Sequence, residues 1–328
     1  MLNQSVMCCL AIDIPVGNSS ASENAGRRHQ VKAKGAKRTS MFDWKDIADR
    51  KSRFMDSIDD YAAASAVIIG APMDFTASFR PGSRGGPQSI REASYGLEWY
   101  SPALDRDLHE ISFVDLGDLV LPIGNVSGSL ELIRKACNRI LGDNKMPFLL
   151  GGEHLVSLPA IEAAAERYND PVLLHFDAHT DLRTEFFGEA LSHANVIRLA
   201  LERGFVSDVH QFGIRSGDKP EFEYAREHTH LHSDVIEPFE RLLPSLGNKP
   251  IYVTVDIDVL DPAFAPGTGT PEPGGISSGE LLKVIRKLRG LNVVGFDLVE
   301  IAPVYDHSEA TSLVGAKILR EAMLALVK

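Results

Sequence analysis

Apolar runs of strand length recur along most of this chain and alternate with stretches whose apolar residues return at helical spacing. The runs cover residues 66–72, 147–154, 171–179, 209–215, 251–259 and 292–300, with a weaker one at 113–119. Continuous apolar strands separated by amphipathic helices are typical of a mostly parallel sheet that is buried on both faces. We therefore predict an α/β fold of three layers, α/β/α, built on a doubly wound sheet.

Three segments between the runs show the helical pattern most clearly. Apolar residues share one face over 127–141, and the segments 279–289 and 311–327 repeat this pattern. Cys137 lies on the apolar face of the first segment, which predicts a small core residue there and no reactive role.

Residues 1–40 differ in composition from the rest of the chain. They are rich in Gly, Ser, Asn and Ala, and their Lys and Arg residues outnumber their acidic residues. We predict a disordered tail that carries no clear signal-peptide cleavage site. Met41 opens the patterned part, which raises the hypothesis that the tail lies outside the natural translation product. No linker interrupts the remainder, so 41–328 is predicted to be a single domain.

Composition narrows the class of partner. The formal net charge is −11, which makes nucleic acid and anionic membranes poor partners and small cationic molecules better ones. Three cysteines provide no disulfide framework and suit a reducing compartment, so we predict a cytoplasmic protein. No apolar run approaches the roughly 20 residues of a membrane-spanning helix. Nucleic-acid binding through the basic tail remains a distant alternative.

Acidic residues and histidines gather where four of the predicted strands end, and ligands of such sheets bind beyond the carboxyl ends of the strands. They include His154, Asp177, His179, Asp181, Asp256, Asp258 and Glu300. Several buried carboxylates cannot all stay ionised without nearby positive charge, and two divalent cations would balance four aspartates. Mixed carboxylate and imidazole ligands favour Mn²⁺, Fe²⁺ or Zn²⁺ over Ca²⁺. The sequence therefore predicts a binuclear metal site at this edge.

Each of these pieces also has a purely structural interpretation. Asp-x-Asp after a strand is often a turn, and glycines before a histidine often serve a tight turn. We interpret His175 as a packing residue within its strand. The alternating histidines at 228–232 are interpreted as the solvent face of a short edge segment, because no carboxylates of matching spacing accompany them. Arg80 and Arg84 could reach a site mouth, but surface positions are the default for loop arginines.

Taken together, these stretches resemble the ureohydrolase family, which includes the arginases and agmatinases. Three motifs carry the resemblance: GGEHLVSLP (151–159), HFDAHTD (175–181) and DIDVLDPAFAPGTGTPEPGG (256–275). The likeness extends over roughly 42–327, and its detail is most similar to the bacterial agmatinases. Glu153 stands where the family usually has Asp before its first histidine ligand.

The resemblance implies an arginase-like fold, a homo-oligomer (trimer or hexamer) and a bridged pair of Mn²⁺ ions in each subunit. One ion would be held by His154, Asp177, Asp181 and Asp256, the other by His179, Asp177, Asp256 and Asp258, with Asp177 and Asp256 bridging. A hydroxide bridging the ions would attack the guanidinium carbon, and the products would be urea and an amine. Glu300 matches the glutamate that holds the guanidinium, and His193 matches the proton shuttle to the leaving amine.

The identity of the guanidino substrate is the least determined point. The loop 182–189 lacks the Asn and Ser pattern with which arginases bind the amino-acid end. Glu185 and Glu189 could favour the second positive charge of agmatine, whereas Arg183 could meet a carboxylate. We predict hydrolysis of agmatine to putrescine and urea. Arginase or another guanidino-acid ureohydrolase such as guanidinobutyrase is the alternative. A metal-binding protein without catalysis is a distant alternative from another class, and intact Glu300 and His193 argue against it.

Overall fold

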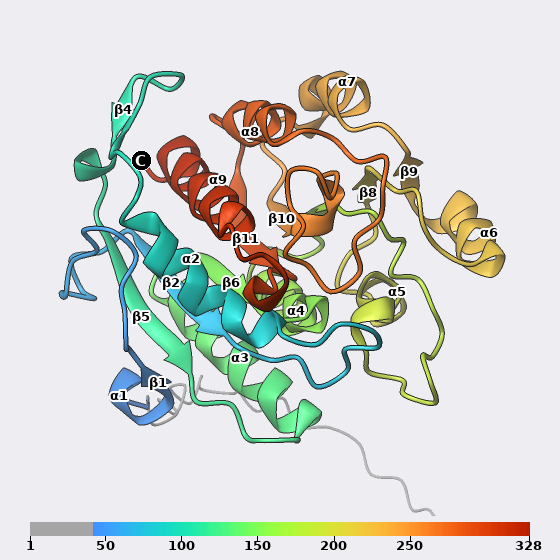
Figure 1. Cartoon of the computed structure of the whole chain (residues 1–328), viewed down its shortest axis with the longest axis horizontal. Helices are drawn as coiled ribbons and strands as arrows, with labels where there is room; N and C mark the ends of the chain where they lie inside the picture. The colour runs from blue at the N-terminus through green and yellow to red at the C-terminus, as the bar shows by residue number, and fades with distance from the viewer. Residues whose placement is uncertain (1–41) are drawn as a thin grey trace, which may run out of the picture. The chain divides into compact units, whose positions relative to one another are not determined.

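A nine-stranded sheet runs through residues 42–328, which are the residues that the computed structural model describes (Figure 1). Its spatial order is β1 (Ala48–Asp49), β5 (Phe113–Leu119), β2 (Ala66–Ala71), β6 (Met146–Gly151), β11 (Val293–Val299), β10 (Ile251–Asp256), β7 (Val172–Phe176), β8 (Val209–Phe212) and β9 (His230–His232). Neighbouring strands are parallel except for β1, which runs antiparallel to β5. A separate pair is formed by β3 (Tyr100–Ser101) and β4 (Arg106–Asp107).

Helices cover both faces of this sheet. One layer contains α2 (Gly86–Ser94), α9 (Ala310–Leu326), α8 (Ser278–Lys287) and α7 (Ile236–Leu246), each in contact with the next (Figure 1). The other contains α3 (Val126–Gly142), α4 (Ser157–Tyr168) and α5 (Val196–Glu202), while α6 (Lys219–His228) contacts β9 and α1 (Trp44–Ile47) precedes β1. None of the helices within residues 42–328 combines the length and apolar character needed to cross a bilayer.

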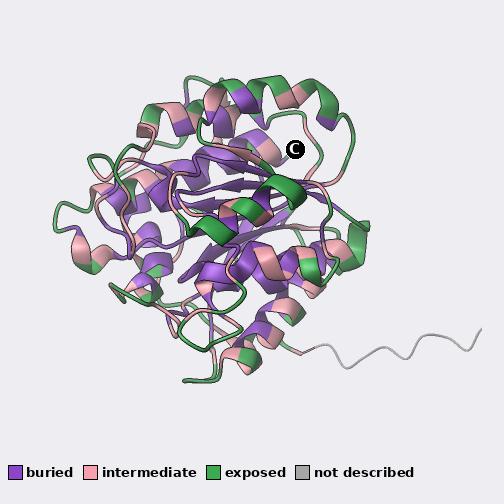
Figure 2. Cartoon of the chain, turned by 90° about the vertical axis from the view of Figure 1, so that its right-hand side faces the viewer, coloured by how far each residue is buried: buried purple, intermediate pink, exposed green. Residues whose placement is uncertain are grey.

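The side chains of β2 show why the apolar runs are continuous. Ala66 and Ile68 join the core cluster that includes α2 and α9, whereas Val67 and Ile69 join the cluster that includes α3 and α4. Successive residues of a strand point to opposite faces, so a strand covered on both sides needs an apolar residue at every position. Burying each large aliphatic side chain contributes about 1.5–3 kcal/mol. Figure 2 shows the sheet as the buried centre of this part of the chain.

The predicted α/β/α architecture is confirmed, and all seven apolar runs contain strands of the sheet. The predicted runs extend past the true strand ends: the run at 147–154 leaves its strand after Gly151, and the run at 171–179 leaves its strand after Phe176. These overruns are the loops that carry the site. Because β6, β11, β10 and β7 are adjacent and parallel, their carboxyl ends meet along one stretch of the same edge.

The predicted helices at 127–141, 279–289 and 311–327 are confirmed as α3, α8 and α9, and Cys137 is a buried residue of α3. The sequence analysis did not identify the helices α2, α4, α5, α6 and α7. Buried residues in α4 spread around the helix, so its apolar positions do not mark a single face. The expectations for residues 1–40 concern a segment outside the described residues. The described residues form one compact unit, and the division into tail and catalytic domain stays a prediction.

Candidate metal centre

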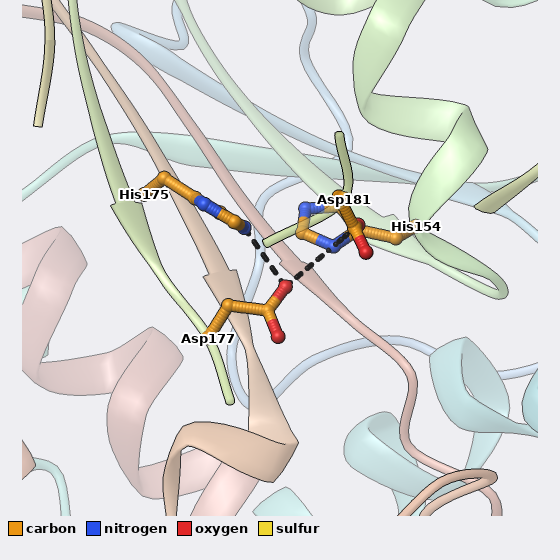
Figure 3. A group of neighbouring side chains, drawn as sticks. All are labelled: His154, His175, Asp177 and Asp181. Atoms are coloured by element: carbon orange, nitrogen blue, oxygen red, sulfur yellow. Dashed lines mark hydrogen bonds and ion pairs between the residues drawn. The ribbon is translucent and has the colours of Figure 1, made fainter. Parts of the chain in front are cut away.

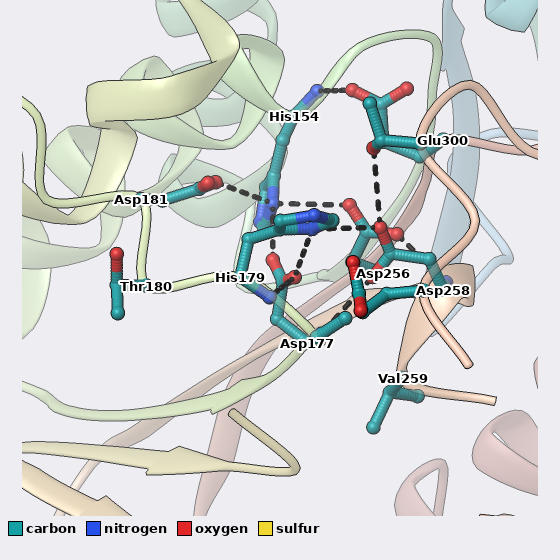
Figure 4. Close-up of polar contacts among 12 residues, drawn as sticks. His154, Asp177, His179, Thr180, Asp181, Asp256, Asp258, Val259 and Glu300 are labelled. Carbon is teal, nitrogen blue, oxygen red and sulfur yellow. Dashed lines mark hydrogen bonds and ion pairs between the residues drawn. The ribbon is translucent and has the colours of Figure 1, made fainter. Parts of the chain in front are cut away.

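All six predicted metal ligands lie together at the carboxyl end of the sheet (Figure 4). His154 opens a short 3₁₀ helix just after β6, and Asp256 is the last residue of β10. Asp258 lies in the 3₁₀ turn that follows β10, and Asp177, His179 and Asp181 lie in the loop after β7. Five of the six are buried, and His179 is partly buried. The structure thus brings charges from three strand ends into one desolvated group.

Three carboxylates face one ring nitrogen of His154 (Figures 3 and 4). Its Nδ1 atom lies 3.1 Å from Asp177 Oδ2, 3.1 Å from Asp181 Oδ2 and 3.4 Å from Asp256 Oδ2. Within residues 42–328 this buried nitrogen has no hydrogen-bond partner of suitable geometry. A nitrogen surrounded by three acceptor oxygens requires a proton or a cation between them.

The second ring nitrogen of His154 is fixed by a network inside the sheet. Its Nε2 atom lies 2.9 Å from Thr254 Oγ1, and the Thr254 hydroxyl donates to Asp297 Oδ1 at 2.5 Å. The Tyr252 hydroxyl donates to the other oxygen of Asp297 at 2.9 Å. Since the Thr254 proton is directed to Asp297, its oxygen is free to accept the Nε2 proton. A neutral His154 therefore presents the lone pair of Nδ1 to the carboxylates, and fixing a ligand's tautomer in this way is typical of metal-binding histidines.

A second group forms around His179. Its Nδ1 atom lies 3.0 Å from Asp258 Oδ2 and 3.5 Å from Asp177 Oδ1. Asp177 therefore directs Oδ2 toward His154 and Oδ1 toward His179, as expected of a carboxylate shared by two ions. Asp256 reaches the first group at 3.4 Å, and its predicted bridging to the second group stays a prediction.

Burial and mutual repulsion shift the pKa values of these aspartates. Burial, followed by Asp258 and Asp177, raises the pKa of Asp256 well above its usual range. Burial and Asp177 likewise raise the pKa of Asp258. Burial also acts against ionised Asp177, but its histidine neighbours outweigh burial and hold the pKa of this carboxyl well below its ordinary value. Without cations, this group must therefore take up protons to be stable.

The two histidines receive those protons. Burial alone lowers the pKa of His154, but Asp177, Asp181 and Asp256 outweigh burial and raise it well above its ordinary value. The pKa of His179 is raised in the same way, against burial, by Asp258 and Asp177. Protons thus occupy the positions where cations of higher charge would be held.

Sequence reasoning missed two residues that position Asp177. His175 Nε2 lies 2.8 Å from Asp177 Oδ2 (Figure 3), and the Gln211 amide donates to His175 Nδ1 at 3.0 Å. His175 Nε2 thus carries the proton and donates it to the carboxylate, so the packing interpretation of His175 was incomplete. Gln211 also donates to the Thr180 carbonyl at 2.8 Å. A glutamine within the buried strand predicted at 209–215 was the available signal.

A cavity of about 260 Å³ opens beside this cluster. Its lining includes His154, His179, Asp181 and Asp256, together with Ser78, Arg183, Phe186, His193, Ala194, Ser216, Gly217, Asp218, Glu221, Thr270 and Glu300. Both predicted catalytic residues, Glu300 and His193, thus face the same space as the predicted metal ligands.

Glu300 follows β11 with a left-handed backbone, φ 64°, and is 8% exposed. Its Oε1 atom accepts a hydrogen bond from the His154 backbone N–H at 2.8 Å (Figure 4), which fixes the carboxylate beside the predicted metal ligands. Burial, together with the charge of Glu153, raises the pKa of Glu300 to about 8. A non-glycine residue in this backbone region costs free energy that the surroundings must offset, and such residues cluster at functional sites.

His193 begins a 3₁₀ turn between β7 and α5 and is oriented by Thr76. Its Nδ1 atom lies 3.3 Å from Thr76 Oγ1, and this oxygen also accepts from the His193 backbone N–H at 3.1 Å. Thr76 is held in turn by Glu153, whose Oε2 accepts from its N–H at 2.7 Å and its hydroxyl at 2.9 Å. Burial lowers the pKa of His193, so the ring is neutral near pH 7. The sequence analysis did not identify Thr76.

Several other candidate residues lie away from the cavity. Arg80 stacks over the Tyr305 ring at 4.0 Å, and Arg84 pairs with Asp74. Glu185 and Glu189 are absent from the lining of the described cavity, whereas Arg183 is part of it. The acidic residues that stand beside Arg183 are instead Asp218 and Glu221.

The alternating histidines do lie at the sheet edge, because β9 is the last strand of the sheet. The structure brings one carboxylate near them that their spacing did not indicate: Asp208 Oδ1 lies 3.0 Å from Nε2 of His210 on the neighbouring strand and 3.7 Å from His230 Nε2. This oxygen comes from the residue just before β8, so it is close in space but not in sequence. His228 instead stacks on Tyr224.

Comparison with known proteins adds independent information. The chain matches the Arginase family over residues 64–325. It is 52% identical over 279 residues to the agmatinase of Bacillus subtilis (strain 168), an alignment that covers 84% of this chain and 96% of that protein. It is 37% identical over 276 residues to the human mitochondrial guanidino acid hydrolase, covering 80% of this chain and 78% of that protein. The crystal structure of the agmatine ureohydrolase of Thermoplasma volcanium is similar with a TM-score of 0.77 at 32% identity, covering 84% of this chain and 94% of that one.

Proposed function

The chain belongs to the arginase family, and on that premise we propose that it is an agmatinase, a metal-dependent hydrolase that converts agmatine into putrescine and urea. The observation that carries the proposal is the shared cavity, in which Glu300 stands beside a buried cluster of aspartates that lacks balancing charge. The 52% identity to the Bacillus subtilis agmatinase over nearly its whole length supports agmatine as the substrate.

The donor set fits a pair of divalent cations. Nδ1 of His154 is buried, lacks a hydrogen-bond partner among the described residues and faces three carboxylate oxygens. Asp177 offers one oxygen to each histidine group, as a bridging ligand would. We assign His154, Asp177, Asp181 and Asp256 to one ion, and His179, Asp177, Asp256 and Asp258 to the other. Mixed oxygen and imidazole donors support Mn²⁺ for both positions.

When bound, two such cations would supply Lewis acidity that brings the pKa of a shared water toward neutrality and provides hydroxide as the nucleophile. The protein's own residues prepare that site. Thr254 and Asp297 fix the tautomer of His154, and His175 and Gln211 fix the orientation of Asp177. Both networks are buried, so the ligands are held in place before any substrate arrives.

Two residues act on the substrate itself. Glu300 presents a carboxylate to the planar guanidinium, whose N–H groups match two acceptor oxygens. The His154 backbone N–H occupies Oε1 of Glu300, which sets the direction from which the guanidinium is held. His193 is neutral, lines the same cavity and is oriented by Thr76. At one ring nitrogen it would take up the proton of the hydroxyl that has added to the guanidinium carbon, and it would pass that proton to the leaving amine, a step suited to an imidazole near pH 7.

The proposal extends to the setting of the enzyme. We propose that the protein forms a homo-oligomer, a trimer or a hexamer, and the family resemblance supports this oligomeric state. A cytoplasmic location is supported by the low cysteine content. Size-exclusion chromatography with light scattering measures the oligomeric state, and a monomer at micromolar concentration would contradict the proposed homo-oligomer.

Steady-state urea release tests the function. The purified protein is loaded with MnCl₂ and assayed on agmatine, arginine and 4-guanidinobutyrate, with metal content measured on the same sample. We expect the highest kcat/KM for agmatine and about two Mn²⁺ per chain. A higher kcat/KM for either of the other compounds would overturn the agmatine assignment. Metal binding without urea release from any of the three would favour the non-catalytic alternative.

A guanidino-acid hydrolase is the second candidate. Two observations favour it: the 37% identity to the human guanidino acid hydrolase and the presence of Arg183 in the cavity lining, where a free guanidinium would attract a carboxylate. The surroundings of Arg183 therefore bear directly on the choice between the two substrate classes.

A further inference from the structure

The edge strands β8 and β9 bring together a second group of metal-binding residue types, outside the lining of the cavity. Asp208 directly precedes β8, His210 is the second residue of β8, and His230 opens β9. Residues two apart along a strand share a face, so the side chains of Asp208 and His210 point the same way. β8 and β9 are neighbours at the end of the sheet (Figure 1), and their register pairs His210 with His230. Three side chains therefore converge near the amino ends of these strands.

The donor atoms of this group have the spacing that one small ion needs. Asp208 Oδ1 lies 3.0 Å from His210 Nε2 and 3.7 Å from His230 Nε2, and the three atoms all lie within 4.8 Å of one another. Zinc–ligand distances of about 2.0–2.2 Å place two donors of a tetrahedral ion roughly 3.3–3.6 Å apart. The carboxylate oxygens around His154 Nδ1 at the candidate metal centre, at 3.1 to 3.4 Å, have a similar spacing.

Two of the three side chains are held in this position by the fold. The Asp208 carbonyl accepts from the Leu173 N–H at 2.9 Å, and Asp208 Oδ2 pairs with Lys249 Nζ at 3.1 Å, which leaves Oδ1 to the histidines. The His210 side chain is 10% exposed, and its ring stacks on the His230 ring with the centroids 4.5 Å apart. The His230 side chain is 63% exposed, so it can turn to complete a coordination sphere in which water is the fourth ligand.

Hydrogen bonding within the group does not explain this convergence. His210 Nε2 is within hydrogen-bond distance of Asp208 Oδ1, but His230 Nε2, at 3.7 Å, is too far to donate to the same oxygen. A metal-binding imidazole must be neutral, and burial lowers the pKa of His210 to about 4, so this ring is neutral near pH 7. An ion between the three donors would join all of them at once.

We propose that Asp208, His210 and His230 form a second metal site, which takes one late divalent transition-metal ion such as Zn²⁺ and links β9 to β8. Two imidazoles and one carboxylate bind Zn²⁺ more tightly than Mn²⁺, the ion proposed for the catalytic centre. In the described part of the chain, β9 has three residues and pairs with β8 alone, so an ion here would add a link to the end of the sheet. The inference is independent of the proposed function, because none of the three residues lines the described cavity.

Counting bound metal on the manganese-loaded protein tests this site. Wild type and the His230→Asn variant are dialysed to equilibrium against micromolar free Zn²⁺ at neutral pH, and Mn and Zn per chain are measured by inductively coupled plasma mass spectrometry. We expect the sum of the two metals to be lower by about one ion per chain in His230→Asn. The sum is the quantity compared, because Zn²⁺ that displaces Mn²⁺ from the proposed catalytic centre leaves it unchanged. Zn²⁺ should also raise the urea denaturation midpoint of wild type more than that of His230→Asn.

The matched control is His228→Asn, which removes a histidine that stacks on Tyr224 and is not one of the three ligands. It should keep the wild-type metal count, whereas His210→Asn should lose one ion as His230→Asn does. Equal counts in wild type and His230→Asn would overturn the proposal. An equal loss in His228→Asn would also overturn it, because the ion would then be held by scattered histidines. Failure of the proposed function looks different: urea release would be absent, while the difference of one ion between wild type and His230→Asn would remain.

Discussion

Buried carboxylates occur in two regions of this protein, and the two regions balance them differently. Between α2 and β5, Arg91 is 1% exposed and donates to Asp115 at 2.8 and 3.0 Å and to Asp118 at 2.5 Å. At the candidate metal centre, four aspartates are paired with three histidines, His154, His175 and His179, and no Lys or Arg within residues 42–328 pairs with them. The first region carries its own cation and the second does not.

The hydrogen bonds of the two regions differ in the same way. Asp115 accepts from the Phe54 and Gly117 N–H groups at 2.8 and 2.9 Å in addition to Arg91, so its acceptor capacity is filled by the protein. His154 Nδ1, in contrast, is buried without a hydrogen-bond partner among the described residues. Buried polar groups are normally satisfied. An unsatisfied donor set beside excess negative charge therefore indicates a place for an external cation.

Removing one carboxylate should have opposite effects on stability in the two regions. Asp256→Asn deletes a proposed metal ligand, so we expect kcat/KM for agmatine to fall by about 10³-fold or more. The same change relieves repulsion and keeps an oxygen to accept the Asp258 N–H, a bond of 2.9 Å. The metal-free variant should therefore be as stable as metal-free wild type, or more stable by about 1 kcal/mol. Urea denaturation in EDTA measures this.

A metal-free Asp256→Asn protein that is less stable than wild type by several kcal/mol would break the comparison, because the aspartates would then be acting as structural groups. The matched control is Asp59→Asn, which removes an exposed carboxylate paired with Arg50 at 2.7 Å. It should leave activity unchanged and barely alter stability, because exposed ion pairs contribute little to it.

At the other region, Asp115→Asn should be strongly destabilising. It leaves the buried Arg91 charge without its main partner, and breaking a buried pair in this way costs about 3–5 kcal/mol. Urea denaturation should show this loss with or without metal, while kcat/KM per folded molecule stays near the wild-type value. A loss below about 1 kcal/mol would mean that Asp118 and the Gly117 carbonyl satisfy Arg91 by themselves.

Mn²⁺ binding should stabilise variants of the two regions to different extents. A ligand that binds only the folded state stabilises it by about 2.7 kcal/mol at a hundred times its Kd. Saturating Mn²⁺ should therefore raise the denaturation midpoint of wild type and of Asp115→Asn by equal free energies, because the two sites share no partner. The same addition should stabilise Asp256→Asn much less. Equal stabilisation of all three proteins would place the cation somewhere other than the predicted ligands.

Sequence patterns predicted the features that depend on residues close together along the chain. The strands β6, β7, β10 and β11 follow from continuous apolar runs, and the aspartates directly after them follow from the rule that ligands bind at carboxyl ends. Glu300 and His193 depended on the resemblance to a known family, because an isolated Glu or His carries little information. The structure adds that both line the cavity beside the cluster.

Contacts between distant segments could not be predicted in this way. Arg183 meets Asp218 across 35 residues, and Gln211 meets His175 across 36. The start of α6, which supplies Asp218 and Glu221, was not identified because its short helix is mostly polar. The sequence analysis therefore looked for a charged wall within the loop at 182–189, whereas the residues that balance Arg183 come from another element.

The edge strands β8 and β9 contain a carboxylate and histidines that are balanced in a way intermediate between the two regions. The effect expected from them, on the pH dependence of stability, is the smallest. Asp208 lies 3.0 Å from His210 Nε2, but its other oxygen already pairs with Lys249 Nζ at 3.1 Å. Burial, assisted by the neighbouring His230 and only partly opposed by Asp208, lowers the pKa of His210 to about 4. The carboxylates beside His179 have no such lysine within residues 42–328, and they raise the pKa of His179 against the effect of burial.

The pH dependence of stability follows from the direction of the His210 shift. In the unfolded chain His210 is protonated below about pH 6.5, whereas in the folded protein it stays neutral down to about pH 4. Stability that is present at pH 7 is therefore lost as the pH falls across that interval. Allowing for solvent near the ring, we expect a loss of about 1 kcal/mol between pH 7 and 5 from this group. In metal-free protein, His210→Asn should reduce that loss, whereas His228→Asn, on the stacked ring beside Tyr224, should not. If His210→Asn leaves the pH dependence unchanged, Asp208 balances His210 despite Lys249, and the contrast with the metal centre becomes one of burial alone.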